Sequence, residues 1–281
     1  MTNVKDPTQI KLQYEAWWQQ TNEALEQVIA SGERNMARLV NETYELSVGP
    51  TPPGERLSLI FGKEVPAPYL YANRVIRDWI ADVIVTAARD GVDAIIETGS
   101  GWGYNLFNVF MRGGPRVNYH AFEYTQAGRT CATRLVEATG DDMDLEIHSF
   151  NYLSPDLSSI AGRYKKVLLF TSHSIEQIPA LPPSFVEEVL NVSPRVHVLH
   201  FEPVGWQTAP SGRKPKAPAR GMEHAIKHGY NQNLRALLSS FEQSNRIVVD
   251  DTIRDVMAVK LSNPTTFLSW RSKDLLCSSP T

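Results

Sequence analysis

The sequence has few of the features that mark secreted or membrane-spanning proteins. Cysteine occurs only at Cys131 and Cys277, too far apart for a CxxC pair and too few for a disulfide framework. No stretch approaches the roughly 18 consecutive apolar residues that span a bilayer. We therefore expect a cytoplasmic protein that makes no use of a membrane.

The chain also lacks a strong excess of charge of either sign. Its 28 basic and 31 acidic side chains give a formal net charge of -3. A balance of this kind offers no general attraction to nucleic acid or to an anionic surface, so the composition disfavours a nucleic-acid partner. What remains is the composition of an ordinary globular protein of 281 residues.

The first quarter of the chain reads as two helices and a connector. Apolar side chains recur at helical spacing over residues 8–46, and Gly32 breaks the pattern. Residues 48–68 are crowded with proline and glycine, which predicts a connecting segment. We expect residues 1–66 to form a helical cap with its connector, and residues 67–281 to form the main domain.

The main domain alternates between helical and strand-like patterns. After a helix over residues 69–89, five short apolar runs follow, namely DAIIET, RVNYHAFE, DLEIHSF, KKVLLFTS and RVHVLHFE. Such alternation predicts βαβ units with a parallel sheet. Two further runs, RIVVDDTIRDVMAV and TTFLSWR, are joined too closely for parallel pairing. The sequence thus predicts an α/β fold with a Rossmann-like seven-stranded sheet, mostly parallel with an antiparallel last strand, and helices on both faces.

A glycine-rich turn follows the first predicted strand, in AIIETGSGWG over residues 94–103. Open α/β sheets bind ligands outside the carboxyl ends of their strands. Dinucleotide sites carry GxGxxG, whereas Gly99, Gly101 and Gly103 give GxGxG. Glu97 stands two residues before the first glycine, where a carboxylate would repel a pyrophosphate and attract an ammonium group. The ligand should therefore have a cationic end and no phosphates.

ETGSGWG resembles the first motif of the class I S-adenosylmethionine-dependent methyltransferases, an acid followed by GxGxG. The resemblance covers roughly residues 67–271, including the closing antiparallel pair. It implies S-adenosylmethionine as the cofactor, with Glu97 facing the methionine amino group and Gly99 and Gly101 admitting the methionine and ribose. Gly103 would open the following helix.

Further residues fit the cofactor site that the resemblance implies. Glu123 ends the second strand about 20 residues beyond the glycines, where an acid accepts hydrogen bonds from ribose hydroxyls in nicotinamide enzymes as well. Asn151 and its neighbour Phe150 fit the adenine-reading position, although a turn-capping asparagine is nearly as good an interpretation. Trp102 could offer a cation–π contact to a sulfonium, with simple packing as the alternative.

The polar residues after the fourth strand, in KKVLLFTSHSIEQIP, predict side chains that face the ligand crevice. We expect Thr171 at the cofactor. If the acceptor is a hydroxyl, a base must take its proton, and His173 is the best placed candidate, with Glu176 second. A capping role for His173 is the alternative.

The remaining candidates concern the acceptor. His200 and Glu202 share one face at the end of the fifth strand, where they could bind substrate, support His173 or fill polar space. Tyr71 is a further candidate contact. Arg213 lies in a basic loop at residues 207–221, which predicts either a lid for a carboxylate or phosphate or a solvated loop.

His224 and His228 stand four residues apart, which is metal-ligand spacing on a helix. A third ligand from His200 or Glu202 is imaginable, but a solvated helix face is the better interpretation of two histidines alone. We predict no metal.

These patterns favour an S-adenosylmethionine-dependent methyltransferase acting on an oxygen or nitrogen of a small-molecule acceptor. The alternatives are an NAD-dependent dehydrogenase and a catalytically silent nucleotide-binding protein. The turn TSHSIEQ, residues 171–177, lacks the Asn/Asp-Pro-Pro-aromatic motif typical of enzymes that methylate base amines in nucleic acids. The sequence leaves open the identity of the acceptor and whether the chain forms a homo-oligomer.

Overall fold

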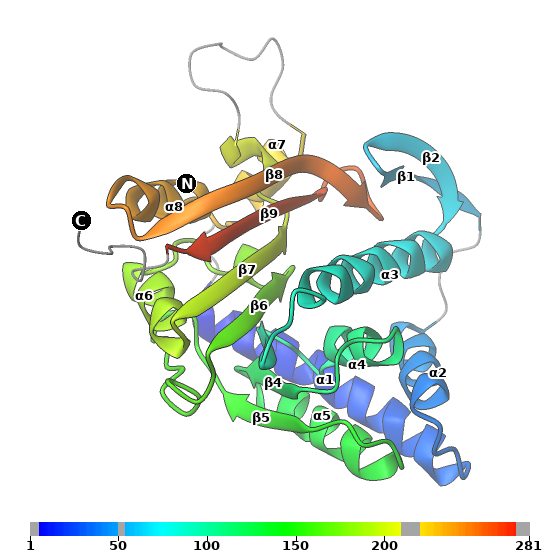
Figure 1. The fold of residues 1–281 in the computed structure, drawn as a ribbon. Coiled ribbons are helices and arrows are strands. Elements are labelled where there is room, and N and C mark those ends of the chain that lie inside the picture. The colour runs from blue at the N-terminus through cyan, green and yellow to red at the C-terminus, as the bar shows by residue number, and fades with distance from the viewer. Residues whose placement is uncertain (1–5, 50–53, 209–219, 274–281) are drawn as a thin grey trace.

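The computed structural model describes residues 6–49, 54–208 and 220–273, which fold around one mixed sheet (Figure 1). Its strands are β1 (Glu55–Ile60), β2 (Lys63–Pro68), β3 (Ala94–Thr98), β4 (Asn118–Glu123), β5 (Leu145–Ser149), β6 (Lys166–Ser172), β7 (Arg195–Glu202), β8 (Ile247–Ala258) and β9 (Thr265–Ser272). Its α-helices are α1 (Pro7–Ala30), α2 (Met36–Val48), α3 (Tyr69–Ala88), α4 (Tyr104–Met111), α5 (Gln126–Ala138), α6 (Pro183–Val192), α7 (Met222–Lys227) and α8 (Leu234–Gln243). Two 3-10 turns, η1 (Ile175–Gln177) and η2 (Gly205–Thr208), complete the elements.

The strands lie in the order β2-β1-β8-β9-β7-β6-β3-β4-β5. Strands β3 to β7 run parallel, whereas β9 is antiparallel to both of its neighbours, β7 and β8. The predicted α/β fold is therefore confirmed, and the last strand is antiparallel as predicted. The sheet as a whole is mixed rather than mostly parallel, because β2–β1, β1–β8, β8–β9 and β9–β7 all pair antiparallel. The chain moves from β3 outward to β5 and then returns to β6, on the other side of β3. This reversal is the switch point at which open α/β sheets bind their ligands.

The prediction of seven strands is wrong, because the sheet has nine. The extra two are β1 and β2, which form a hairpin in the segment expected to be only a connector, and β1 pairs with β8. Phe61 and Gly62 make the two-residue loop with φ of 47° and 75°, so both have the left-handed backbone that this tight turn requires. Pro66 and Pro68 are tolerated because β2 is the outermost strand, where a missing N–H costs little.

Helices cover both faces of the sheet, as predicted. On one face, Ile80 of α3, Phe107 of α4 and Leu135 of α5 join one buried cluster. On the other face, Phe185 of α6 and Leu238 of α8 join a second. No helix within the described ranges is long and apolar enough to cross a membrane.

The two predicted N-terminal helices are present as α1 and α2, and α1 packs along α5. Two polar side chains of α1 fix this packing. The Glu15 carboxylate accepts hydrogen bonds from the backbone N–H groups of Gln126 (3.0 Å) and Ala127 (2.8 Å), and the Asn22 amide donates to the Ala127 carbonyl (2.9 Å). A carboxylate at the first turn of a helix is favourable because unpaired N–H groups point at it. The boundary at residues 66 and 67 stays a prediction.

Glu15→Ala should lower the free energy of unfolding by about 1–2 kcal/mol, the usual worth of a helix cap, because two N–H groups of α5 lose their acceptor. Urea unfolding followed by circular dichroism would measure this. Glu23→Ala is the matched control, since Glu23 is exposed on the same helix, and we expect a change within about 0.5 kcal/mol. Equal stabilities of the two variants would contradict the docking role of Glu15.

Candidate active site

A cavity of about 1010 Å³ lies at the carboxyl ends of β3, β4 and β6, on the switch point of the sheet. Its walls come from the glycine turn after β3, from the turn after β6 and from α1, α2 and α3. Small-molecule sites usually measure about 300–1,000 Å³. The cavity is therefore large enough for a cofactor together with an acceptor.

The glycine turn fits closely into its surroundings. Gly99, Gly101 and Gly103 have φ of 71°, 57° and 83°, a conformation that glycine adopts without strain. A Cβ at Gly99 would lie 2.4 Å from the Cβ of Ser174, and one at Gly101 would lie 2.7 Å from Trp18 on α1. Both separations are too short for real atoms, so any side chain here would force the turn away from the β6 loop and from α1.

Glu97 is completely buried at the base of this turn. One carboxylate oxygen accepts a 2.7 Å hydrogen bond from the Asn105 amide, and the other has no partner. Burial raises the pKa of Glu97 well above its usual range, because a charged carboxylate is costly away from water. Glu97 does not itself line the cavity, whereas Asn105 does. The orphaned oxygen is the kind of buried polar atom that a bound cation or donor would satisfy.

Arg77 is a cavity residue that the sequence did not reveal. It lies on α3, where its guanidinium sits 4.2 Å from the ring centroid of Tyr104 and 4.8 Å from that of Tyr44. Its Nε donates to the Asn73 side chain at 2.7 Å. The sequence showed α3 as an apolar stripe, and a single arginine between two aromatic rings leaves no periodic signal. Its positive charge acts on the buried Glu97, whose pKa it lowers against the larger effect of burial.

Glu123, predicted to hold a ribose, lines the cavity and is buried. Its carboxylate accepts hydrogen bonds from the Gly101 N–H (2.8 Å), the Thr125 N–H (2.9 Å) and the Thr125 hydroxyl (2.6 Å). Glu123 thus ties the glycine turn to the start of α5. A carboxylate has about four acceptor positions, so a further donor can still be bound.

Only some of the other predicted cofactor residues line the cavity. Trp102 and Asn151 line the cavity, but Phe150 is buried beside the ring of Tyr152, 5.0 Å away. The Asn151 side chain accepts a 3.0 Å hydrogen bond from the Leu153 N–H, which is the turn-capping contact weighed as its alternative. Among predicted substrate contacts, Tyr71 is exposed and does not line the cavity.

His173 lies in the cavity wall directly after β6, with its side chain 31% exposed. Its φ of 50° is an uncommon backbone conformation for a residue other than glycine. Nδ1 lies 3.1 Å from the Glu176 carboxylate and Nε2 lies 2.7 Å from the Thr265 hydroxyl. Burial disfavours the charged imidazolium, but the nearby carboxylates of Glu176 and Glu202 outweigh it and raise the pKa of His173.

Glu202 holds this turn from behind. Its completely buried carboxylate accepts hydrogen bonds from the backbone N–H groups of Ser174 (3.1 Å), Ile175 (3.2 Å) and Glu176 (3.3 Å). Burial raises the pKa of Glu202 to about 7. Neither Glu202 nor Glu176 lines the cavity. Their position is that of supports for His173, the second of the roles considered for Glu202.

His200 and Thr171 also lie behind the cavity wall and are completely buried. His200 Nε2 accepts a 2.9 Å hydrogen bond from the Trp270 indole, so Nδ1 carries the proton toward the Thr171 hydroxyl at 3.0 Å. Burial lowers the pKa of His200 to about 3, which keeps the ring neutral. Both residues are thus engaged within the protein core.

The structure also places aromatic residues of α1 in the cavity. Tyr14, Trp17 and Trp18 line it, and the ring centroids of Tyr14 and Trp18 lie 6.1 Å apart. Burial, and then the charge of Glu176, raises the pKa of Tyr14, so its hydroxyl stays protonated. Tyr14 and Trp18 belong to the apolar helical pattern predicted over residues 8–46, but such a pattern does not say which surface covers it.

The structure describes the histidine pair with metal-ligand spacing but only the ends of the basic loop at residues 207–221. His224 and His228 lie side by side, with ring centroids 4.2 Å apart. Within residues 6–49, 54–208 and 220–273, no third His, Cys, Asp or Glu joins them at ligand distance. Arg213 and residues 209–219 of the loop lie outside the described residues.

No family model and no curated protein matches the chain. Among the solved structures to which it is similar is SAH-bound PaMTH1 of Podospora anserina, at 15% identity and a TM-score of 0.48 over 72% of this chain and 79% of that one. A SAM dependent methyltransferase from Aquifex aeolicus matches at 12% identity and a TM-score of 0.43 over 74% of this chain and 100% of that one. The N-terminal domain of EvdMO1 in the presence of SAH and D-fucose matches at 12% identity and a TM-score of 0.45 over 69% of this chain and 82% of that one. The match to EvdMO1 itself spans 40% of that chain. At these identities and TM-scores the similarities carry no functional argument, so the function is inferred from the site.

The neutral His200 makes a prediction about acid stability. Its folded pKa lies below the ordinary value of about 6.5, so the unfolded chain binds the extra proton and stability falls as pH drops from 6.5 toward 3. His200→Gln keeps an acceptor for Trp270 but does not titrate. Urea unfolding at pH 6.5, 5.5 and 4.5 would give the free energy of unfolding at each pH. With falling pH, this free energy should decrease less steeply in His200→Gln than in the wild type, by up to about 1.4 kcal/mol per pH unit. Identical slopes would mean that His200 is protonated inside the fold.

Proposed function

We propose that the chain is an S-adenosylmethionine-dependent methyltransferase that acts on an oxygen or nitrogen of a small molecule. The observation that carries this proposal is a buried acid with an unpartnered oxygen, Glu97, near a cavity cation, Arg77, at a glycine turn on the switch point. The charge of Arg77 acts on Glu97, lowering its pKa against the larger effect of burial.

This pair matches the two charges of an amino acid. An α-ammonium group suits the free oxygen of Glu97, and an α-carboxylate suits the Arg77 guanidinium, which carries donors in a fork that fits carboxylates. Asn105, which lines the cavity and bonds Glu97, lies where it can join the recognition. The amino-acid end of S-adenosylmethionine has both groups, whereas a dinucleotide has neither an α-ammonium nor an α-carboxylate.

The nucleoside end of S-adenosylmethionine fits the other side of the glycine turn, beside Glu123. Glu123 borders the cavity with acceptor capacity to spare, which suits ribose hydroxyls. A pyrophosphate here would lie against the Glu123 carboxylate, and like charges in a poorly solvated cleft repel strongly. It also offers no cation or donor to the unpartnered oxygen of Glu97. The same acids that favour a cationic amino-acid tail therefore disfavour the NAD-dependent dehydrogenase.

The acceptor would bind near His173. The cofactor supplies an electrophilic methyl group when it is bound, so the protein mainly aligns the acceptor and removes its proton. The Glu176 carboxylate accepts a hydrogen bond from the Nδ1–H of His173. Nε2 is then the base that points toward the cavity, where it contacts the Thr265 hydroxyl. An acceptor hydroxyl can replace that contact. Glu202 would keep the turn in place, and Arg213 of the basic loop remains a proposed contact for an anionic acceptor.

Calorimetric titration with S-adenosylhomocysteine (SAH) tests the cofactor. We expect micromolar binding, weakened by at least about tenfold in Glu97→Gln, a loss of roughly 1.4 kcal/mol. Because a bound ammonium lowers the raised pKa of Glu97, binding should also release protons, so the measured heat should differ between phosphate and Tris buffers in the wild type but not in the variant.

Glu137→Gln is the matched control for that titration, because Glu137 is an exposed glutamate on α5. It should bind SAH as the wild type does. Wild-type protein that binds NADH but not SAH would overturn the assignment. SAH binding with no methyl transfer to any acceptor in a screen with labelled cofactor would instead favour a catalytically silent protein.

His173→Asn tests the base once an acceptor is found in that screen. For a hydroxyl acceptor, kcat should fall by about 10²–10⁴, while SAH affinity is retained. The raised pKa of His173 places the rise of wild-type kcat with pH above 6.5, since the base works only when unprotonated, and the variant should lose this rise. A rise that persists in the variant would remove His173 as the base.

A further inference from the structure

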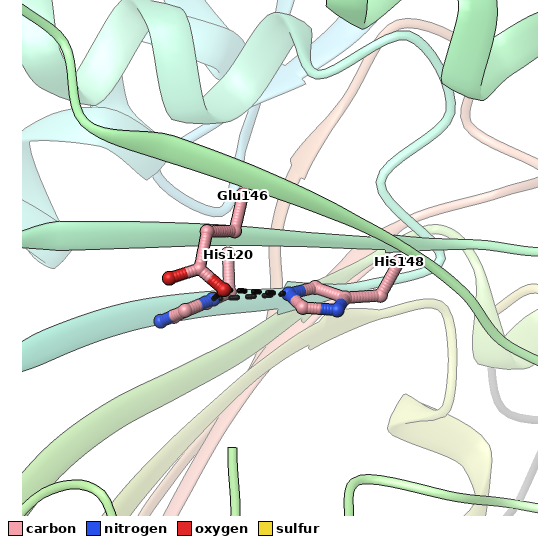
Figure 2. A group of neighbouring side chains, drawn as sticks. All are labelled: His120, Glu146 and His148. Carbon is pink, nitrogen blue, oxygen red and sulfur yellow. Dashed lines mark hydrogen bonds and ion pairs between the residues drawn. The ribbon is translucent and has the colours of Figure 1, made fainter. Parts of the chain in front are cut away.

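Three potential metal ligands meet on the sheet, away from the cleft. His120 lies on β4, and Glu146 and His148 lie on the edge strand β5, whose residues pair with β4 in parallel register (Figure 2). Alternate residues of a strand share a face, so Glu146 and His148 point toward the same side of the sheet as His120. None of the three lines the large cavity. They form a separate group, which we call the β4–β5 triad.

The spacing of the triad fits a small tetrahedral cation. His120 Nδ1 lies 3.1 Å from His148 Nε2, and Glu146 Oε2 lies 3.9 Å and 3.8 Å from these two nitrogens. Ligands bound to Zn²⁺ at about 2.0–2.1 Å in a tetrahedron lie about 3.3 Å apart. Small side-chain rotations would bring all three atoms to that separation.

The other nitrogen of each imidazole already has a polar contact. His120 Nε2 lies 2.7 Å from the Tyr164 hydroxyl, and His148 Nδ1 lies 3.2 Å from the Ser159 hydroxyl. Metal-binding histidines usually donate their second N–H to such a partner, which fixes the ring and its tautomer. His148 is also stacked on Phe122, with ring centroids 4.4 Å apart. Both rings are thus held with their inner nitrogens facing one another.

The direct contact of the two imidazoles bears on their tautomers. At 3.1 Å, either His120 Nδ1 or His148 Nε2 carries the proton of the hydrogen bond between them. A metal bound to both nitrogens would therefore require a change of tautomer in one ring.

Two contacts compete with a metal. The imidazoles can share a direct hydrogen bond, and Arg163 donates to both Glu146 oxygens, at 2.8 Å to Oε2 and 2.5 Å to Oε1. Binding needs Oε2 to turn from Arg163, which can keep its contact with Oε1. The Glu146 side chain is 36% exposed, which leaves a path for an ion and a fourth position for water.

We propose that His120 Nδ1, His148 Nε2 and Glu146 Oε2 bind one Zn²⁺ ion with a water molecule in the fourth position. Two imidazoles and a carboxylate are a donor set that zinc accepts. The ion would join the edge strand β5 to β4. Its role is stabilisation of this edge of the sheet, independent of the methyltransferase proposal.

The test uses the full chain freed of metal by a chelator and titrated with Co²⁺ as a visible probe, then with Zn²⁺ in competition. The wild type should take up one Co²⁺ per chain with the visible absorption of a tetrahedral site, and Zn²⁺ should displace it and raise the thermal midpoint. His148→Ala should weaken Zn²⁺ binding by at least about 100-fold. His224→Ala, in the other histidine pair, should bind Zn²⁺ as the wild type does.

Two results would overturn the proposal. One is a wild-type chain that binds neither ion, in which case the two imidazoles simply share a hydrogen bond. The other is a Zn²⁺ affinity that is kept in His148→Ala or lost in His224→Ala. If His148→Ala does not fold, Glu146→Gln takes its place, because Glu146 is partly exposed and its amide cannot supply an anionic ligand. Unchanged affinity in Glu146→Gln would also contradict the proposed ligand set.

Discussion

Buried carboxylates hold the loops of the cleft in place by accepting hydrogen bonds from backbone N–H groups. Glu123, at the end of β4, binds the Gly101 N–H, and Glu202, at the end of β7, binds three successive N–H groups of the turn after β6. Backbone donors that leave a parallel sheet must find partners, and a charged acceptor makes the strongest of these bonds. The positions of the glycine turn and of His173 depend on these two side chains.

This way of fixing loops has an electrostatic consequence. Glu123 and Glu202 bring negative charge to a poorly solvated region, and this charge adds to the burial that raises the pKa of Glu97. Within the described part of the cleft, the cation Arg77 and the imidazole of His173 partly balance that charge. A ligand with a positive end completes the balance, so the scaffold of the loops and the choice of ligand have the same physical origin.

The sequence revealed those features whose cause is local. Strand periodicity predicted β3 to β9, and the spacing of three glycines predicted the turn that borders the cavity. The β1–β2 hairpin was missed because the prolines and glycines of residues 48–68 indicate a connector. In addition, Phe61 precedes Gly62 where asparagine or aspartate is the usual hairpin signal. Arg77, Tyr14 and Trp18 were missed for a different reason. Their roles come from which helix packs against which loop, and helical periodicity carries no such information.

Strand register likewise brings together residues that the sequence alone does not associate. His120 and His148 are 28 positions apart, and only the alignment of β4 with β5 brings their rings together. Conversely, His224 and His228 have metal-ligand spacing but gain no third ligand among the described residues. His200 and Glu202 were correctly placed at the end of a strand, yet their side chains turn to the Trp270 indole and to the β6 turn rather than to the cavity.

The hairpin that widens the sheet also sets which backbone groups one edge of the sheet exposes. An outermost strand with free backbone donors is a template on which a second chain can aggregate. Strand β2 carries Pro66 and Pro68, which have no N–H to offer, and begins with the charged Lys63 and Glu64. The same prolines that disguised this segment in the sequence therefore protect the finished protein against sheet-to-sheet polymerisation at that border.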